Sequence, residues 1–196
     1  MSSIGKITKK IGNRFLNFYE LEAVSRDGRS FPYYMVSRNG DPDNLKAVTH
    51  HNNPDGVILF GVYGEEKDKL VLVRQYRYPI QQVTLEIPAG KLDAEGEEPL
   101  DCARRELSEE TGYQAEKYTF LTKLATTVGF SNEFIYIYAA EGLTAGRQHP
   151  DEDEFINVCT LTMDEAMAKI RSGEICDAKS VTAVLLLRDL QDLQGR

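Results

Sequence analysis

The chain has 196 residues, of which 41% are hydrophobic and 28% charged, and its formal net charge is −8 at pH 7. This composition excludes a disordered chain, and the length suffices for one domain with a modest extension. The acidic balance argues against a nucleic-acid partner, because binding to a phosphate backbone needs a basic surface. No run approaches the roughly 20 apolar residues of a membrane span, and three scattered cysteines do not form a disulfide framework. We therefore expect a cytoplasmic protein without a membrane partner.

The first predicted element is an antiparallel hairpin over about residues 8–38. Apolar and polar residues alternate on either side of Arg26-Asp27-Gly28-Arg29, in which Asp-Gly is a strong turn signal. Two buried strands are then predicted at Gly56–Val62 and Lys69–Val73, joined by the polar turn Gly64–Asp68. These two strands would form the central sheet.

A helix is predicted from Pro99 to Thr111, because proline suits a first helical position and Gly112 suits the residue just past the end. Within it, Glu106, Glu109 and Glu110 stand at i, i+3 and i+4, which places three carboxylates on one face. The opposite face carries an apolar stripe that would seat the helix on a core, formed by Leu100, Ala103 and Leu107.

The remaining elements complete a mixed fold. Further strands are predicted at about Val83–Ile87, Thr119–Ala125 and Phe134–Ala139. A capping box at Thr162–Glu165 opens a helix to about Ile170, and a last amphipathic helix runs from about Ser180 to Leu193. Strands interleaved with helices predict an α/β fold, in which helices cover a mixed sheet.

Three glutamates on one helix face are typical of a site for a hard divalent cation. Like charges at i,i+4 destabilise an isolated helix by roughly 0.2–0.5 kcal/mol per pair, so folding does not require this cluster. Mg²⁺ and Mn²⁺ prefer oxygen ligands and keep waters or substrate phosphates in their shell. The alternative interpretation is a solvated helix face held by ion pairs.

The stretch from Ala89 to Tyr113 resembles the signature motif of the Nudix hydrolases, which ends in Arg-Glu-apolar-x-Glu-Glu-x-Gly-apolar. Residues Arg105–Tyr113 match this half completely. Upstream, the loop Lys91–Gly96 carries one extra residue, and counting back from Arg105 keeps Glu97 in register. The resemblance implies a Nudix-type α/β/α sandwich with a mixed sheet and an amino-terminal antiparallel hairpin extension.

The same resemblance implies a metal-dependent hydrolase that uses Mg²⁺, with Mn²⁺ as a substitute. The backbone carbonyl of Ala89 and the carboxylates of Glu106, Glu109 and Glu110 would then hold the metal ions. Arg105 would hold Glu97 or a neighbouring glutamate in place.

Segments outside the motif resemble the ADP-ribose pyrophosphatase subgroup, namely Val73–Pro79, Leu85–Gly90 and Gly129–Glu133. Within them, Arg77 and Arg74 are candidates for bidentate phosphate binding. The alternative for Arg77 is a surface ion pair with Glu86 or another carboxylate. Glu86 and Glu133 match acidic positions of the subgroup near the substrate and metals.

In that subgroup, the amino-terminal hairpin helps to build a dimer and contacts the nucleotide in the partner's site. The resemblance therefore implies a homodimer with a hairpin region at residues 1–45 for dimerisation and nucleotide contacts, and a Nudix hydrolase domain at residues 46–196. Six aromatic residues are candidates to stack on adenine, with core or dimer packing as the alternative. They are Phe15, Phe18, Tyr19, Phe31, Tyr33 and Tyr34.

The acidic loop Asp151–Glu154, followed by Phe155, resembles the catalytic loop of the subgroup. The match puts Glu154 at the position of the general base, with Glu152 as the alternate. As plain sequence, four consecutive acids usually form a solvated turn. The expected reaction is cleavage of a small-molecule nucleotide, ADP-ribose, to AMP and ribose 5-phosphate. The alternatives are a broader nucleoside-diphosphate-sugar, FAD or NADH pyrophosphatase, and a non-catalytic ADP-ribose sensor.

Overall fold

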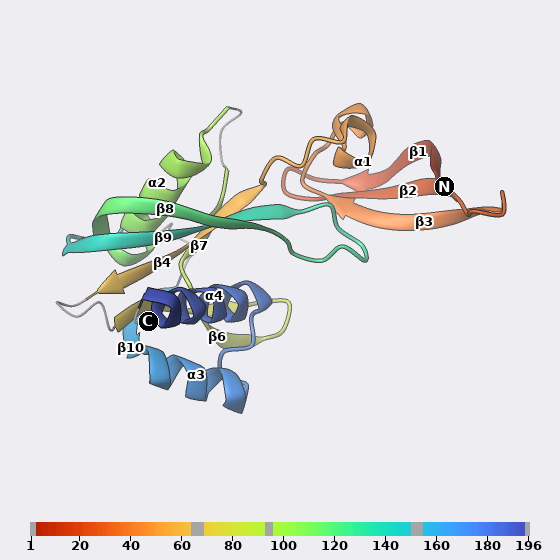
Figure 1. Ribbon diagram of the computed structural model, residues 1–196. Helices are drawn as coiled ribbons and strands as arrows, with labels where there is room; N and C mark the ends of the chain where they lie inside the picture. Colours follow the sequence, from red (N-terminus) through yellow and green to blue (C-terminus); the bar gives the residue numbers. More distant parts are fainter. Residues whose placement is uncertain (1–2, 64–68, 93–95, 150–154, 195–196) are drawn as a thin grey trace. The chain divides into compact units, whose positions relative to one another are not determined.

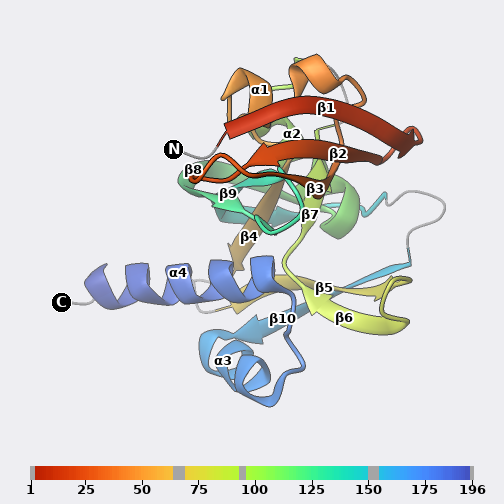
Figure 2. The same cartoon turned by 90° about the vertical axis from the view of Figure 1, so that its right-hand side faces the viewer.

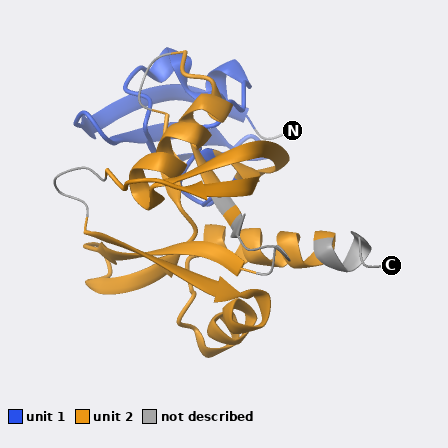
Figure 3. Cartoon of the chain, turned by 90° about the vertical axis from the view of Figure 1, so that its left-hand side faces the viewer, with its two compact units in different colours: residues 1–55, 125–134 blue, residues 56–124, 135–196 orange. Residues whose placement is uncertain are grey.

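The structure is a computed structural model that describes residues 3–63, 69–92, 96–149 and 155–194. The chain divides into two compact units, one of residues 1–55 with 125–134 and the other of residues 56–124 with 135–196 (Figure 3). Within the described ranges, no helix has both the length and the apolar character needed to cross a membrane. The predicted turn Gly64–Asp68 lies outside the described residues.

The first unit contains a three-stranded antiparallel sheet in the order β1-β2-β3. Its strands are β1 (Ser3–Gly12), β2 (Asn17–Val24) and β3 (Ser30–Ser37), shown in red to orange in Figure 1. The β2–β3 pair confirms the predicted hairpin, and its turn residue Gly28 has a φ of 83°, a backbone conformation that glycine adopts without strain. The predicted hairpin began too early, because residues 8–12 belong to β1, a separate strand that pairs with β2.

Two short helical turns follow this sheet, η1 (Pro42–Asn44) and α1 (Lys46–Thr49). Each is too short to give a periodic signal in the sequence. The core of the first unit is small and consists of Tyr19, Leu21, Met35 and Leu45. The complete burial of Tyr19 fits the core-packing alternative for this residue rather than base stacking.

The second unit is built on a mixed seven-stranded sheet. Its strands are β4 (Gly56–Tyr63), β5 (Lys69–Arg77), β6 (Gln82–Glu86), β7 (Ala89–Lys91), β8 (Tyr113–Ala125), β9 (Phe134–Ala145) and β10 (Ile156–Thr162). The main order is β10-β5-β4-β9-β8, with β6 beside β5 and β7 beside β4. β4 and β9 are parallel, whereas β5 is antiparallel to β4, β6 and β10. The predicted strands are present, and β8 and β9 are longer than expected.

Three helices complete this unit: α2 (Pro99–Thr111), α3 (Met163–Ser172) and α4 (Ala178–Gln194). The bounds of α2 are those predicted, and Gly112 ends the helix with a φ of 75°. The capping box at the start of α3 is also present, with Thr162 and Glu165 making reciprocal hydrogen bonds.

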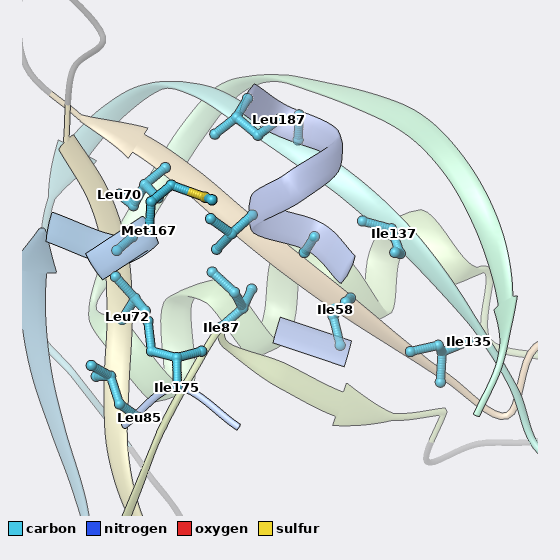
Figure 4. Close-up of a cluster of buried hydrophobic side chains, with 14 residues drawn as sticks. Ile58, Leu70, Leu72, Leu85, Ile87, Ile135, Ile137, Met167, Ile175 and Leu187 are labelled. Atoms are coloured by element: carbon cyan, nitrogen blue, oxygen red, sulfur yellow. The ribbon is translucent and has the colours of Figure 1, made fainter. Parts of the chain in front are cut away.

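Helices cover both faces of the sheet. Val57 of β4 belongs to the buried cluster that includes Cys102, Ala103 and Leu107 of α2. The next residue, Ile58, belongs to the larger cluster that includes Ala183, Val184 and Leu187 of α4, part of which is drawn in Figure 4. Because successive strand residues point to opposite faces, α2 and α4 lie on opposite sides of the sheet, as the views in Figures 1 and 2 agree. This arrangement confirms the predicted α/β/α sandwich.

Candidate active site

The three glutamates predicted to bind metal differ in their exposure on α2. Glu106 and Glu110 are buried, with exposed fractions of 9% and 3%, whereas the side chain of Glu109 is 43% exposed. Burying a carboxylate is costly unless it is paired and hydrogen-bonded. The contacts of these side chains therefore determine what the helix can do.

The guanidinium of Arg105 contacts three glutamates. Its Nε donates a hydrogen bond to Glu97 Oε1 at 3.1 Å. Its Nη1 donates to Glu106 Oε1 at 2.8 Å and to Glu109 Oε2 at 3.0 Å, and its Nη2 donates to the carbonyl of Lys91 at 3.1 Å. Partial burial lowers the pKa of Arg105, but the contacts with the three glutamates outweigh this effect and raise the pKa. Arg105 is thus fixed as a cation that orients its carboxylate neighbours.

Strand β7 brings the backbone of Ala89 and Gly90 to α2. The N–H of Ala89 donates to Glu110 Oε2 at 3.0 Å. A Cβ on Gly90 would lie 1.7 Å from Glu106 Cδ, so the carboxylate occupies the space of a side chain at this position. Pairing of Ala89 with Ile58 fixes this backbone in the sheet. The structure therefore places Ala89, Glu106 and Glu110 together.

These residues fit a divalent cation by their donor chemistry and by their charge. Among the residues that the structure describes, no three acidic, histidine or cysteine side chains form a ready metal-binding group. However, the carboxylates of Glu97, Glu106 and Glu109 contact Arg105, and the carboxylate of Glu110 accepts the N–H of Ala89. Carboxylate oxygens are the donors that hard divalent cations prefer.

Arg77 and Glu86 form a bidentate ion pair. Arg77 Nε donates to Glu86 Oε1 at 2.8 Å, and Nη2 donates to Oε2 at 2.6 Å. The hydrogen bonds to Glu86 raise the pKa of Arg77, against the opposing effect of burial. Burial raises the pKa of Glu86, but hydrogen bonds from Arg77 and Thr84 lower it to a net value below the ordinary one. The structure thus shows the ion pair that the sequence left as the alternative for Arg77.

The remaining predicted residues have other contacts or lie outside the described residues. Arg74 contacts Glu174 Oε1 at 3.5 Å, and its spacing of three from Arg77 along β5 puts the two arginines on opposite faces of the strand. Glu133 belongs to the first unit, where Arg38 Nε donates to its Oε1 at 2.9 Å. Glu152 and Glu154 lie outside the described residues.

Two contacts at this site were not expected from the sequence. Gln148 Nε2 donates to the carbonyl of Glu110 at 2.7 Å, across 38 residues, and to the carbonyl of Ile156 at 3.3 Å. Ser180 Oγ accepts a hydrogen bond from the N–H of Ile87 at 2.9 Å, across 93 residues. Neither Gln148 nor Ser180 belongs to a recognisable sequence motif, so these contacts become evident only in the folded chain.

The family comparison agrees with this geometry. The NUDIX domain family matches residues 52–183. The chain therefore belongs to the Nudix hydrolase family, which confirms the resemblance of the signature motif. Enzymes of this kind generally depend on a divalent metal.

Particular relatives share most of the chain. The ADP-ribose pyrophosphatase of Bacillus subtilis (strain 168) is 38% identical over 160 residues, which are 81% of this chain and 83% of that protein. The methanol dehydrogenase activator of Bacillus methanolicus is 41% identical over 152 residues, 76% and 79% of the two chains. The GDP-mannose pyrophosphatase of Cronobacter sakazakii (strain ATCC BAA-894) is 33% identical over 172 residues, 83% and 86% of the two chains.

A solved structure described as an ADP compounds hydrolase superposes with a TM-score of 0.82 at 22% sequence identity. The matched region covers 100% of this chain and 96% of the chain in the solved structure. At this level of identity, the likeness establishes the fold.

Proposed function

We propose that this Nudix enzyme hydrolyses the pyrophosphate bond of ADP-ribose and releases AMP and ribose 5-phosphate. The observation that carries the proposal is the contact of two buried carboxylates, Glu106 and Glu110, with the backbone of Gly90 and Ala89. This contact joins both halves of the signature motif into one acidic site. The relative named ADP-ribose pyrophosphatase supports the choice of substrate.

We assign Mg²⁺ as the metal, with Mn²⁺ as a substitute. The carbonyl of Ala89 and the carboxylates of Glu106, Glu109 and Glu110 would hold it. When bound, the metal would lower the pKa of a water molecule and screen the anionic phosphates from the attacking oxygen. Arg105, with Glu97 as its further partner, holds the carboxylates of Glu106 and Glu109 in place, a supporting role that tunes metal affinity.

Arg77 and Glu86 are the substrate-binding pair in this proposal. The ion pair fixes the guanidinium, whose side chain is 39% exposed while that of Glu86 is 3% exposed. A guanidinium held in this way loses little further conformational freedom when it meets a phosphate. Arg74 and Glu133 remain candidates for substrate contacts. In the structure, Arg74 contacts Glu174, and Glu133 contacts Arg38.

Glu154 is the proposed general base, with Glu152 as the alternate. The residues that flank this loop support the assignment. The N–H of His149 donates to the carbonyl of Glu109 at 2.9 Å, and Gln148 bridges Glu110 to Ile156. Both described ends of the loop are thus attached to the carboxyl end of α2. The base would take a proton from a water molecule while the oxygen of that water bonds to one phosphorus. The bond from this phosphorus to the bridging oxygen would break, and the other phosphate would leave with its sugar.

We also propose a homodimer, with residues 1–45 for dimerisation and nucleotide contacts and residues 46–196 as the hydrolase domain. Exposed aromatic side chains of the first unit support this assembly, since large exposed apolar patches mark interaction sites. They are Phe15, Phe18, Phe31, Tyr33 and Tyr34. A cytoplasmic location completes the proposal and agrees with the three free cysteines.

Product analysis with Mg²⁺ tests the function. We expect kcat/KM to be highest for ADP-ribose in a panel with ADP-glucose, GDP-mannose, NADH, FAD and diadenosine polyphosphates. A pocket separates such compounds by how it pairs or excludes the second sugar. Binding of ADP-ribose without any product would instead identify a sensor.

A second candidate is hydrolysis of a different nucleoside diphosphate sugar. The relatives named GDP-mannose pyrophosphatase, at 31–34% identity, favour it. A higher kcat/KM for GDP-mannose would leave the metal site and the reaction class in place and would replace only the substrate. The name of the methanol dehydrogenase activator states no substrate and does not discriminate between the two candidates.

A further inference from the structure

Ser180 is a serine of the first turn of α4 that contacts the chain leading into the signature motif. The residue is 1% exposed, and its Oγ accepts the N–H of Ile87 at 2.9 Å. Ile87 lies between β6 and β7 and belongs to neither strand. The hydroxyl therefore satisfies a buried backbone donor that no strand ladder pairs there.

The orientation of this hydroxyl is fixed by Asp177. Ser180 Oγ donates to Asp177 Oδ2 at 2.7 Å, and the N–H of Ser180 donates to the same oxygen at 2.9 Å. Burial raises the pKa of Asp177, but Lys179 and the contacts from Ser180 lower it to a net value below the ordinary one. An ionised carboxylate only accepts hydrogen bonds, so the hydroxyl proton is committed to Asp177 and the lone pairs of the oxygen remain for Ile87.

The segment that Ser180 holds leads directly to the acidic site. Two residues after Ile87, the N–H of Ala89 donates to Glu110 at 3.0 Å. The intervening Pro88 has no N–H, so its own backbone offers no donor to fix the path. The side chain of Ile87 is 1% exposed in the core cluster, beside residues of α4 (Figure 4). Both the side chain and the N–H of Ile87 are thus engaged.

We propose that Ser180 is a positioning residue of the active site: its hydroxyl holds the backbone at Ile87 so that Ala89 meets the carboxylate of Glu110. The inference rests on the proposed metal-binding role of Ala89 and Glu110. Ser180 acts through the backbone at Ile87. Its loss should therefore weaken the metal site more than it weakens the binding of ADP-ribose.

The experiment compares Ser180→Ala and Ser180→Cys with two controls in α4. Thr182→Ala removes a hydroxyl that donates to the carbonyl of Ala178 at 2.8 Å within the helix. Val184→Ala removes buried methyl groups from the same core cluster and controls for lost stability. Binding of Mn²⁺ alone is followed by the electron paramagnetic resonance signal of the free ion. Hydrolysis of ADP-ribose is then measured over a range of Mg²⁺ concentrations.

We expect Ser180→Ala to bind Mn²⁺ about tenfold more weakly or worse, as is typical when an outer partner of a metal site is removed. The half-saturating Mg²⁺ concentration should rise to match, while KM for ADP-ribose changes little and excess Mg²⁺ restores most turnover. Ser180→Cys should lie between, because a thiol is a weaker acceptor than a hydroxyl. The Thr182 and Val184 variants should bind Mn²⁺ like the wild type.

Unchanged Mn²⁺ binding in folded Ser180→Ala overturns the inference, and so does an equal loss in Val184→Ala. If Ser180→Ala does not fold, Ser180→Cys decides by the same criterion. A wild type that binds Mn²⁺ but does not cleave ADP-ribose overturns the proposed substrate, while a Ser180 effect on Mn²⁺ binding would still support the positioning role. A wild type that binds no Mn²⁺ overturns both.

Discussion

The carboxylate of Glu106 lies against the backbone of Gly90, in the space where any other residue would carry its Cβ. A Cβ at this position would stand 1.7 Å from Glu106 Cδ and 1.8 Å from Oε1. The colliding atoms are the far end of a flexible side chain. A larger residue at position 90 would therefore displace the carboxylate without requiring the backbone to unfold.

We predict that Gly90→Ala folds but loses about 100-fold in turnover, because the displaced Glu106 no longer occupies its place in the metal site. The melting temperature should fall by less than about 4 °C, which corresponds to roughly 1 kcal/mol for a chain of this size. Gly40→Ala is the matched control, since a Cβ there meets only ordinary contacts at 3.5 Å or more. Full turnover in Gly90→Ala would show that the position of Glu106 does not matter.

Glu109→Gln and Glu110→Gln should each fold normally and lose at least about 100-fold in turnover. The amide keeps the shape and can still accept the N–H of Ala89 from position 110, but it removes a charged ligand. Circular dichroism and kcat at saturating Mg²⁺ measure the two effects. Reversible loss of activity in EDTA is the accompanying control, and activity that persists in the chelator would contradict a metal-dependent mechanism.

Arg77→Met should destabilise the protein by about 2–3 kcal/mol at pH 7. Removing one partner of a buried ion pair costs roughly 3–5 kcal/mol, reduced here because the side chain of Arg77 is 39% exposed. The pKa of Glu86 in the folded protein is below its ordinary value of 4.5. The ion pair therefore stabilises the fold at pH values above 4.5. This contribution is lost as the pH falls through the pKa that Glu86 has in the folded protein. Denaturant unfolding at pH 7 and in acid should therefore show a difference between variant and wild type that shrinks at low pH.

Arg74→Met is the control for this prediction. Arg74 and Glu174 are both largely exposed, at 45% and 42%, and such surface pairs contribute little to stability. Equal destabilisation by the two arginine variants would mean that the burial of Glu86 does not decide the effect.

Glu154→Gln should lower kcat far more than it raises KM, as expected for a group that acts in the transition state. Glu152→Gln should have the smaller effect. Steady-state kinetics of the two variants under identical Mg²⁺ concentrations provide the comparison. The reverse ranking would assign the base to Glu152 and shift the register of the loop by two residues.

The paired substitution Phe18→Ser and Tyr34→Ser should convert a dimer into a monomer and weaken ADP-ribose binding. The two rings are stacked on the first unit, with centroids 5.7 Å apart, and they are 36% and 48% exposed. An exposed aromatic pair favours burial against a partner surface. Light scattering should give twice 22.1 kDa for the wild type and 22.1 kDa for the variant. A wild type that scatters as 22.1 kDa at working concentration would refute the homodimer.

The sequence by itself determined the bounds of α2 and the face on which its glutamates stand. Pro99 and Gly112 set the bounds of α2 because helix ends depend on local backbone preferences. The spacing of the glutamates on α2 places them on one face whatever the helix packs against. For the same reason, Arg105 reaches Glu109, its neighbour at i+4. These relationships span a few residues, so periodicity alone specifies them.

Tertiary structure decided which groups distant in the sequence come into contact. For Arg77, the sequence left phosphate binding and an ion pair open, and the folded chain shows the ion pair with Glu86. Gln148 and Ser180 reach the site across 38 and 93 residues. Local preferences do not encode such separations. Such distant residues come into contact only when the helices pack on the two faces of the sheet. Burial of apolar side chains then offsets the entropy lost in ordering the intervening chain.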